Sequence, residues 1–238
     1  DPYHVRMTTR LAGQKTFFLP FDQGGNGAGE VGGAGNPQPR DGNYATAYLW
    51  KEVLNRDALL ELLQKFLHLE VREEKDPKTG KLHQKETLIF PRYHQWDVLH
   101  KLLTDVREMG PGQNYLIQHS AGSGKSNSIA WLAHRLTGLH NAQDRKIFQS
   151  VIVVTDRRVL DRQLQGTIRQ FEQVEGLVRT IDKNSAQLRD AINESAAIIV
   201  TTLQKFPVIF REVEHGSRNF AVIVDEAHSS QTGRAALK

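Results

Sequence analysis

Cysteine is absent from this chain of 238 residues, which excludes disulfide bonds and zinc sites built on thiolates. No apolar run approaches the roughly 20 residues that a membrane-spanning helix needs. The first residues, Asp1–His4, show neither an initiator methionine nor a signal-peptide pattern. We therefore expect a protein that makes no membrane contact and resides in the reducing cytoplasm.

Charge of either sign is far from dominant: 31 Lys and Arg against 27 Asp and Glu leave a net charge of +4. This mild basic excess fits a nucleic-acid partner, although ordinary solvated surface explains it equally well. A hydrophobic content of 39% is enough for the core of one large domain, or of one domain with an appendage.

The N-terminal part has little that favours a packed core. Two short strands of a hairpin are expected at His4–Leu11 and Lys15–Phe21. Eight of the 19 glycines lie within residues 24–42, which is typical of a flexible linker or an exposed loop. Gly27, Gly29 and Gly32 match the dinucleotide pattern G-x-G-x-x-G. A dinucleotide site needs a helix directly after this pattern, and Gly33–Pro37 cannot form one. We therefore reject a dinucleotide site here.

A helical spacing of apolar residues predicts a helix over Ala45–Glu70, with a possible break at Asn55–Asp57. Residues 71–86 are charged and include the turn signal Asp76–Gly80. Glu73–Lys75 resembles the end of a nuclease carboxylate–lysine pattern. Without an apolar strand or a partner aspartate, it is better interpreted as a solvated charge run.

From Leu88 onward, helical patterns alternate with short apolar strands, which predicts a parallel sheet in an α/β domain. The expected helices are Gln95–Met109, Lys125–Leu139, Arg158–Phe171 and Ser185–Ile192. The expected strands are Tyr115–Gln118, Val151–Val154, Leu177–Ile181, Ala197–Val200 and Ala221–Val224.

The segment between the first of these strands and its helix has the composition of a phosphate-binding loop. The backbone N–H groups of Ala121, Gly122, Ser123 and Gly124 can turn inward around an anion, and the following helix adds its positive N-terminal dipole. Lys125 can reach the β- and γ-phosphates of a nucleotide, and the Ser126 hydroxyl can bind Mg²⁺. The usual first glycine of the pattern is replaced by His119.

A second acidic motif, Asp-Glu-Ala-His, follows the strand Ala221–Val224. The carboxyl ends of strands are where α/β folds bind ligands, so Asp225 can hold Mg²⁺ and Glu226 can act as general base on the attacking water. His228 is placed to couple the nucleotide site to bound substrate. Together with the phosphate loop, these residues predict a magnesium–ATP site.

Beyond these two motifs, several segments resemble the restriction (motor and nuclease) subunit of type I restriction–modification enzymes, which belongs to helicase superfamily 2. The segments that carry the resemblance are Thr8–Gly13, Thr16–Phe21, Phe90–Gln95, Gln118–Ser126, Val154–Arg157, Leu160–Gln163, Thr201–Phe206 and Asp225–Ser229.

The resemblance implies a RecA-like first helicase lobe with a parallel sheet flanked by helices, preceded by a β-hairpin remnant and a helical connector. The implied parts are an upstream nuclease remnant at 1–22, a glycine-rich loop at 23–43, the connector at 44–87 and the motor lobe at 88–238. It also implies ATP and Mg²⁺ as cofactors, and as partners double-stranded DNA and the methyltransferase and specificity subunits.

The same resemblance assigns further residues. Gln95 matches a glutamine that reads the adenine edge. The residues implied in DNA contact are Thr155, Asp156, Arg157, Arg158, Thr201, Thr202 and Gln204.

The nuclease core and the second motor lobe of such a subunit are expected outside this chain. The second lobe supplies an arginine to phosphoryl transfer, so we expect the chain alone to be inactive. Alternatives left open are another superfamily 2 helicase of repair or RNA metabolism, a phosphate-loop kinase of a small molecule, and a non-catalytic assembly module.

Overall fold

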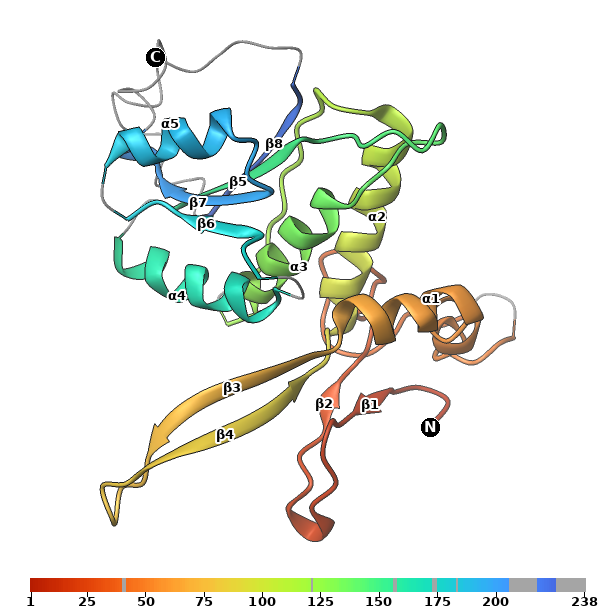
Figure 1. Cartoon of the computed structure of the whole chain (residues 1–238). Helices are drawn as coiled ribbons and strands as arrows, with labels where there is room; N and C mark the ends of the chain where they lie inside the picture. The colour runs from red at the N-terminus through yellow and green to blue at the C-terminus, as the bar shows by residue number, and fades with distance from the viewer. Residues whose placement is uncertain are drawn as a thin grey trace. The chain divides into compact units, whose positions relative to one another are not determined.

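The computed structural model describes residues 1–39, 42–120, 122–155, 158–172, 175–182, 184–205 and 218–225, with backbone only for 158–163. The chain divides into two compact units, Asp1–Val98 and Leu99–Lys238 (Figure 1). In this described part, no helix is long and apolar enough to cross a membrane.

The first unit begins with a short antiparallel pair, β1 (Arg6–Met7) and β2 (Leu19–Pro20), joined through a 3-10 turn at Gly13–Lys15. The predicted hairpin is confirmed, but each strand has two residues instead of the seven or eight expected. The Thr8 hydroxyl donates to the Arg10 carbonyl at 2.9 Å, and the Thr16 hydroxyl donates to the Gly13 carbonyl at 2.8 Å. Such local side-chain bonds compete with strand pairing.

The glycine-rich segment folds back on itself. The Gly24 N–H donates to the Gly35 carbonyl at 2.8 Å, and the Gly25 N–H donates to the Gly33 carbonyl at 2.7 Å. Asn36 then donates to the Tyr3 carbonyl at 2.9 Å, which ties the loop to the start of the chain. No helix begins directly after Gly32, and the next one in the described residues starts at Leu49, in agreement with the rejection of a dinucleotide site.

A helical segment follows, made of two π-helical turns, Leu49–Val53 and Leu62–Phe66, on either side of α1 (Arg56–Glu61). The predicted break is confirmed, because Asn55 caps α1 by accepting the Ala58 N–H at 3.0 Å. The prediction of helix as far as Glu70 is wrong, since the next strand already begins at His68.

That strand, β3 (His68–Lys75), pairs antiparallel with β4 (Leu82–Ile89), so the second half of the expected helical connector is a β-hairpin. Its turn is set by Asp76, whose carboxylate accepts the N–H groups of Lys78 and Thr79 at 2.7 and 3.2 Å. The turn fixes the register and brings two highly charged runs into pairing.

An aromatic cluster forms the core of the first unit. The Tyr93 ring lies 5.8 Å from Phe21, 5.0 Å from Tyr48 and 5.7 Å from Trp96. The Tyr48 hydroxyl donates to the Phe21 carbonyl at 2.5 Å, and Gln23 donates to the Tyr93 hydroxyl at 3.0 Å. Burial raises the pKa of Tyr93 to about 12. These contacts connect three segments that are distant in sequence.

The second unit contains the predicted α/β domain. Its four described strands are all parallel, in the order β6-β7-β5-β8. The strands are β5 (Ser150–Thr155), β6 (Val178–Thr180), β7 (Ile198–Thr202) and β8 (Phe220–Val224). The helices are α2 (Tyr93–Met109, which starts in the first unit), α3 (Lys125–Thr137), α4 (Arg158–Gln170) and α5 (Ser185–Asn193), with a 3-10 turn at Leu203–Lys205.

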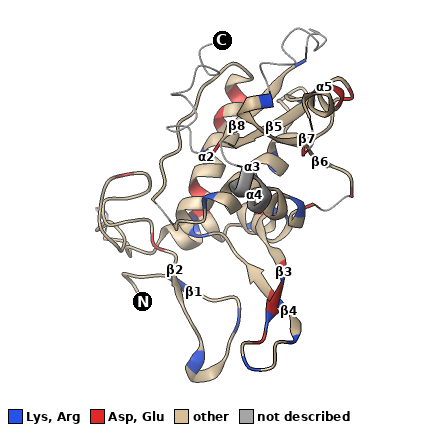
Figure 2. Ribbon diagram, turned by 90° about the vertical axis from the view of Figure 1, so that its left-hand side faces the viewer, with Lys and Arg blue, Asp and Glu red and all other residues tan. Residues whose placement is uncertain are grey.

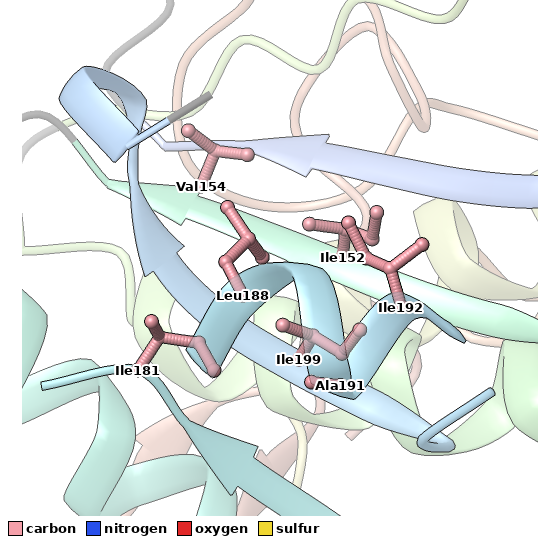
Figure 3. Close-up of a cluster of buried hydrophobic side chains, with 7 residues drawn as sticks. All are labelled: Ile152, Val154, Ile181, Leu188, Ala191, Ile192 and Ile199. Carbon is pink, nitrogen blue, oxygen red and sulfur yellow. The ribbon is translucent and has the colours of Figure 1, made fainter. Parts of the chain in front are cut away.

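Helices cover both faces of this sheet (Figure 1). On one face α5 packs into a buried cluster with Ile152 and Val154 of β5 and Ile199 of β7 (Figure 3). On the other face α3 and α4 contact the sheet. Strand β5 lies between β7 and β8, and all of its residues are buried, which explains its uninterrupted apolar sequence. The predicted RecA-like architecture is confirmed.

One predicted strand is absent. Tyr115–Gln118 has no strand partner in the described sheet, and its apolar side chains are exposed, Leu116 to 87%. A strand requires a neighbouring backbone to pair with. The outer edge of β8 remains open in the described residues, with Val222 57% exposed. The prediction of a strand at Tyr115–Gln118, which rested on apolar composition alone, is therefore wrong for the described structure.

The α5 cluster provides a stability test. Leu188→Ala removes a fully buried side chain from between α5 and the sheet, so the free energy of unfolding should fall by about 2–5 kcal/mol. The measurement is urea unfolding followed by circular dichroism. The control Leu116→Ala truncates an exposed leucine of the same unit and should change stability by less than about 0.5 kcal/mol. Equal losses would contradict the packing.

A second test concerns His134, which joins α3 to α4. Its Nε2 lies 2.9 Å from the Ile168 carbonyl, and burial lowers its pKa below the usual 6.5. The unfolded chain therefore binds the proton more readily. Unfolding free energy should be at its full value above pH 6.5 and should decline as pH falls through the folded pKa. His134→Gln should flatten this decline in thermal melts, whereas His140→Gln, at an exposed position, should leave it unchanged.

Candidate nucleotide site

The predicted phosphate loop has the backbone that an anion cradle requires. Gly122 and Gly124 have φ values of +73° and +86°, in the left-handed region that favours glycine. Gly124 is the N-cap of α3, and its carbonyl accepts the N–H groups of Asn127 and Ser128 at 3.1 and 3.2 Å. A Cβ built on Gly122 would meet no atom within 4 Å, so the loop borders open space.

The electrostatics of the loop favour an anion. The first N–H groups of a helix have no acceptor inside it and carry the positive end of the helix dipole. The first turn of α3 contains no acidic residue that would occupy them. Lys125 is half-buried and Ser126 is exposed in this turn. The loop therefore presents positive charge and a hydroxyl together.

The connectivity places this helix terminus near the carboxyl edge of the sheet. Strand β5 follows α3 in the chain, and α3 contacts β5, β7 and β8. The C-terminal end of α3 leads to the start of β5. Since α3 has 13 residues and is therefore about 20 Å long, its N-terminus lies toward the opposite edge of the sheet, where the strands end. This is the edge where α/β folds bind ligands.

Three predicted motifs meet at that carboxyl edge. Thr155 at the end of β5 is paired in register with Thr202 of β7, and Val154 with Thr201. On the other side of β5, the Asp225 N–H donates to the Val154 carbonyl at 2.9 Å, just after β8 ends. Parallel pairing thus brings Asp225 into the same row as the threonines, although 70 residues separate it from Thr155.

The threonines of this row are buried. Thr155, Thr201 and Thr202 are 1%, 0% and 4% exposed, whereas Gln204 is exposed. The hydroxyls of Thr155 and Thr201 have no hydrogen-bond partner among the described residues. An unpaired buried hydroxyl costs about 1–3 kcal/mol, so a bound water or ligand at this edge would find two unused polar groups. Their contact with DNA stays a prediction.

Several predicted residues fall outside what the structure describes: Ala121, Asp156, Arg157, Glu226 and His228. Arg158 begins α4, but its side chain is likewise outside the description.

Gln95 belongs to the first unit, whereas the phosphate loop belongs to the second. Its side chain is 4% exposed, and its Oε1 accepts the Arg92 N–H at 2.9 Å at the start of α2. In this structure Gln95 acts as a helix cap. Adenine reading by Gln95 stays a prediction.

Sequence reasoning missed one residue near this edge. Lys205, in the turn after β7, donates from Nζ to the Ile181 carbonyl that follows β6. The contact anchors the segment that carries Gln204. No sequence signal could have identified it, because the two residues are 24 positions apart and the acceptor belongs to the backbone.

A glycine loop at the start of a helix, a parallel sheet and a carboxylate at a strand end define the class as a helicase-like, phosphate-loop ATPase domain. Residues 94–238 match the family model of the SWI2/SNF2 ATPases, and the chain belongs to that family. No curated protein matches the chain. The matched region contains the phosphate loop, Asp225 and the whole described sheet.

The loop backbone itself can be tested. Gly122→Val imposes a β-branched residue on a φ of +73° and places its side chain in the open space of the cradle. Binding of a fluorescent ATP analogue should weaken at least about tenfold, equivalent to 1.4 kcal/mol. Gly138→Val, at a φ of −105° after α3, is the matched control and should leave binding unchanged. Equal weakening in both variants would contradict the assignment.

Proposed function

We propose that this chain contains the ATP-binding motor lobe of the restriction subunit of a type I restriction enzyme, which translocates along double-stranded DNA. The observation that supports the motor assignment is the row of Thr155, Thr202 and Asp225 at the carboxyl edge of the parallel sheet, toward which the chain connectivity directs the glycine loop before α3. Membership of the SWI2/SNF2 ATPases supports ATP as the nucleotide.

The residues of the site fit ATP and Mg²⁺. The N–H groups of the loop and of the first turn of α3 would hold the phosphates, with Lys125 as the neighbouring positive charge. The Ser126 hydroxyl and the Asp225 carboxylate offer the hard oxygen ligands that Mg²⁺ prefers. When bound, the metal ion neutralises negative charge on the phosphates. The open space beside Gly122 leaves room for these groups.

Glu226 is the proposed general base. Glu226 follows Asp225 directly in the sequence, and under this proposal its carboxylate would accept a proton from the attacking water. We assign His228 to coupling between the nucleotide and DNA, and Gln95 to the adenine. These roles rest on the resemblance of the surrounding motifs.

The restriction assignment rests on the segments that flank the motor. Thr8–Gly13, Thr16–Phe21 and Phe90–Gln95 resemble the corresponding segments of type I restriction subunits, and almost all of their residues precede the matched ATPase region. Under this proposal the partners are double-stranded DNA and the methyltransferase and specificity subunits, and the intact protein also cleaves DNA.

A second candidate is another DNA translocase of the same ATPase family, without nuclease activity. It is favoured by the family match, which covers only residues 94–238 and does not include most of the segments that carry the restriction resemblance. Cleavage of DNA by the intact protein together with its partner subunits separates the two candidates. ATP-dependent movement without cleavage would favour the second.

The motor assignment is tested by two substitutions in the intact protein. Lys125→Ala should abolish ATP binding, whereas Glu226→Gln should retain binding and lower DNA-stimulated hydrolysis by at least about 100-fold, as expected for loss of a general base. The readouts are nucleotide titration and phosphate release. Lys146→Ala, at an exposed position of the same unit, is the control and should behave as wild type. Wild-type hydrolysis by Glu226→Gln would contradict the base assignment.

A further inference from the structure

The first unit carries two hairpins that project from its body. Figures 1 and 2 both show the β1–β2 hairpin and the β3–β4 hairpin extending toward the same side. The β3–β4 hairpin forms a two-stranded sheet of its own, with eight residues in each strand. At about 3.4 Å per residue it is an arm of about 27 Å. Neither hairpin pairs with another strand in the described part of the chain.

Charge is separated along the longer arm. Along its strands, Arg72 pairs with Glu70 at 2.6 Å and Lys85 pairs with Glu74 at 2.9 Å. The exposed Glu73 and Glu86 add negative charge there, so the strands short of the turn carry more acidic than basic residues. At its end stand three exposed lysines without an ion pair among the described residues: Lys75, Lys78 and Lys81. Figure 2 shows this concentration of basic residues at the free end.

The carboxylate among these lysines does not neutralise them by direct pairing. Asp76 accepts the N–H groups of Lys78 and Thr79, which lower its pKa. It thereby holds the turn, which is closed further by bonds from the Asp76 N–H to the Lys81 carbonyl at 2.9 Å and from the Gly80 N–H to the Asp76 carbonyl at 2.8 Å. The lysines therefore project from an ordered turn.

The β1–β2 hairpin has a similar end. Arg10 and Lys15 are exposed and form no ion pair in the described residues. Local bonds of Thr8 and Thr16 to the backbone order this loop as well. Two ordered, basic hairpin ends thus face the same side of one unit. Surface charge scattered evenly over the unit would not produce this clustering.

We propose that the two hairpin ends form a duplex-DNA contact surface that binds the phosphate backbone independently of sequence. Lysines act as point charges that position a nucleic acid without reading its bases. A duplex keeps its phosphates at fixed spacing, so two ordered ends can engage it together. This inference rests on the proposed DNA motor and gives it a second DNA contact outside the ATPase region.

The test measures binding of the 238-residue chain to a fluorescent 40-bp duplex, without nucleotide, between 50 and 200 mM NaCl. The variant Lys75→Glu/Lys78→Glu/Lys81→Glu should weaken binding at least about tenfold at 50 mM and reduce the slope of log K against log salt by about 2.7, for three phosphate contacts. Arg10→Glu/Lys15→Glu should reduce it by about 1.8. The corresponding glutamine variants should show the same order with smaller losses.

The matched control is Lys51→Glu/Arg56→Glu/Lys65→Glu, which makes the same charge change on exposed residues of the helical segment. It should keep the wild-type slope. Equal losses in the control and the tip variant, or binding of single strands in preference to duplex, would overturn the inference. All variants should retain the wild-type melting transition, since every changed residue is exposed.

The outcome is separable from that of the proposed function. Lys125→Ala removes a nucleotide contact in the other unit and should leave the salt slope unchanged. If the intact protein shows DNA-stimulated ATPase activity while the tip variants bind duplex as wild type does, the hairpin inference fails and the motor stands. If the tips bind duplex but no nucleotide binds, the motor assignment fails instead.

Discussion

The parallel pairing of β5 with β7 on one side and β8 on the other is the constraint on which the candidate site depends. All of β5 is buried, so its backbone groups can be satisfied only by the neighbouring strands. The same pairing aligns Thr155 with Thr202 and places the Asp225 N–H 2.9 Å from the Val154 carbonyl. Groups from three distant parts of the sequence therefore meet at one edge.

The phosphate loop depends on this sheet indirectly, through the packing of α3. Trp131 is 1% exposed and stacks edge-on against Phe171 at 5.4 Å, which fixes α3 against the neighbouring α4 segment. A helix held along its length has a fixed N-terminus, and the left-handed glycines then shape the loop that precedes it. Anion binding in such a site needs little reorganisation, because the N–H groups already point outward from the helix.

The first unit is built on other principles. Its core is the aromatic cluster around Tyr93, and most of β3 and β4 lies outside that core. A two-stranded hairpin exposed on both faces is marginally stable in water by itself. The β3–β4 hairpin also has ion pairs along its strands and a turn closed by hydrogen bonds. The three lysines at its end form no ion pair in the described residues.

The sequence by itself determined the elements whose signal is local. Val151–Val154 is an apolar run because a strand buried on both faces requires one. Gly122–Ser126 was recognisable because the loop needs particular residues at adjacent positions. The helix break at Asn55 could be predicted for the same reason, since a helix cap involves residues that are neighbours in the sequence.

Tertiary structure alone decided what depends on partners distant in the chain. The charged residues of His68–Lys75 and Leu82–Ile89 formed strands because the Asp76 turn brought them face to face. The apolar segment Tyr115–Gln118 has no strand partner among the described residues and forms no strand there. The contact of Lys205 with Ile181 and the burial of the edge threonines likewise arise from strand order. Strand pairing is a relation between two backbones, and a single stretch of residues does not encode its partner.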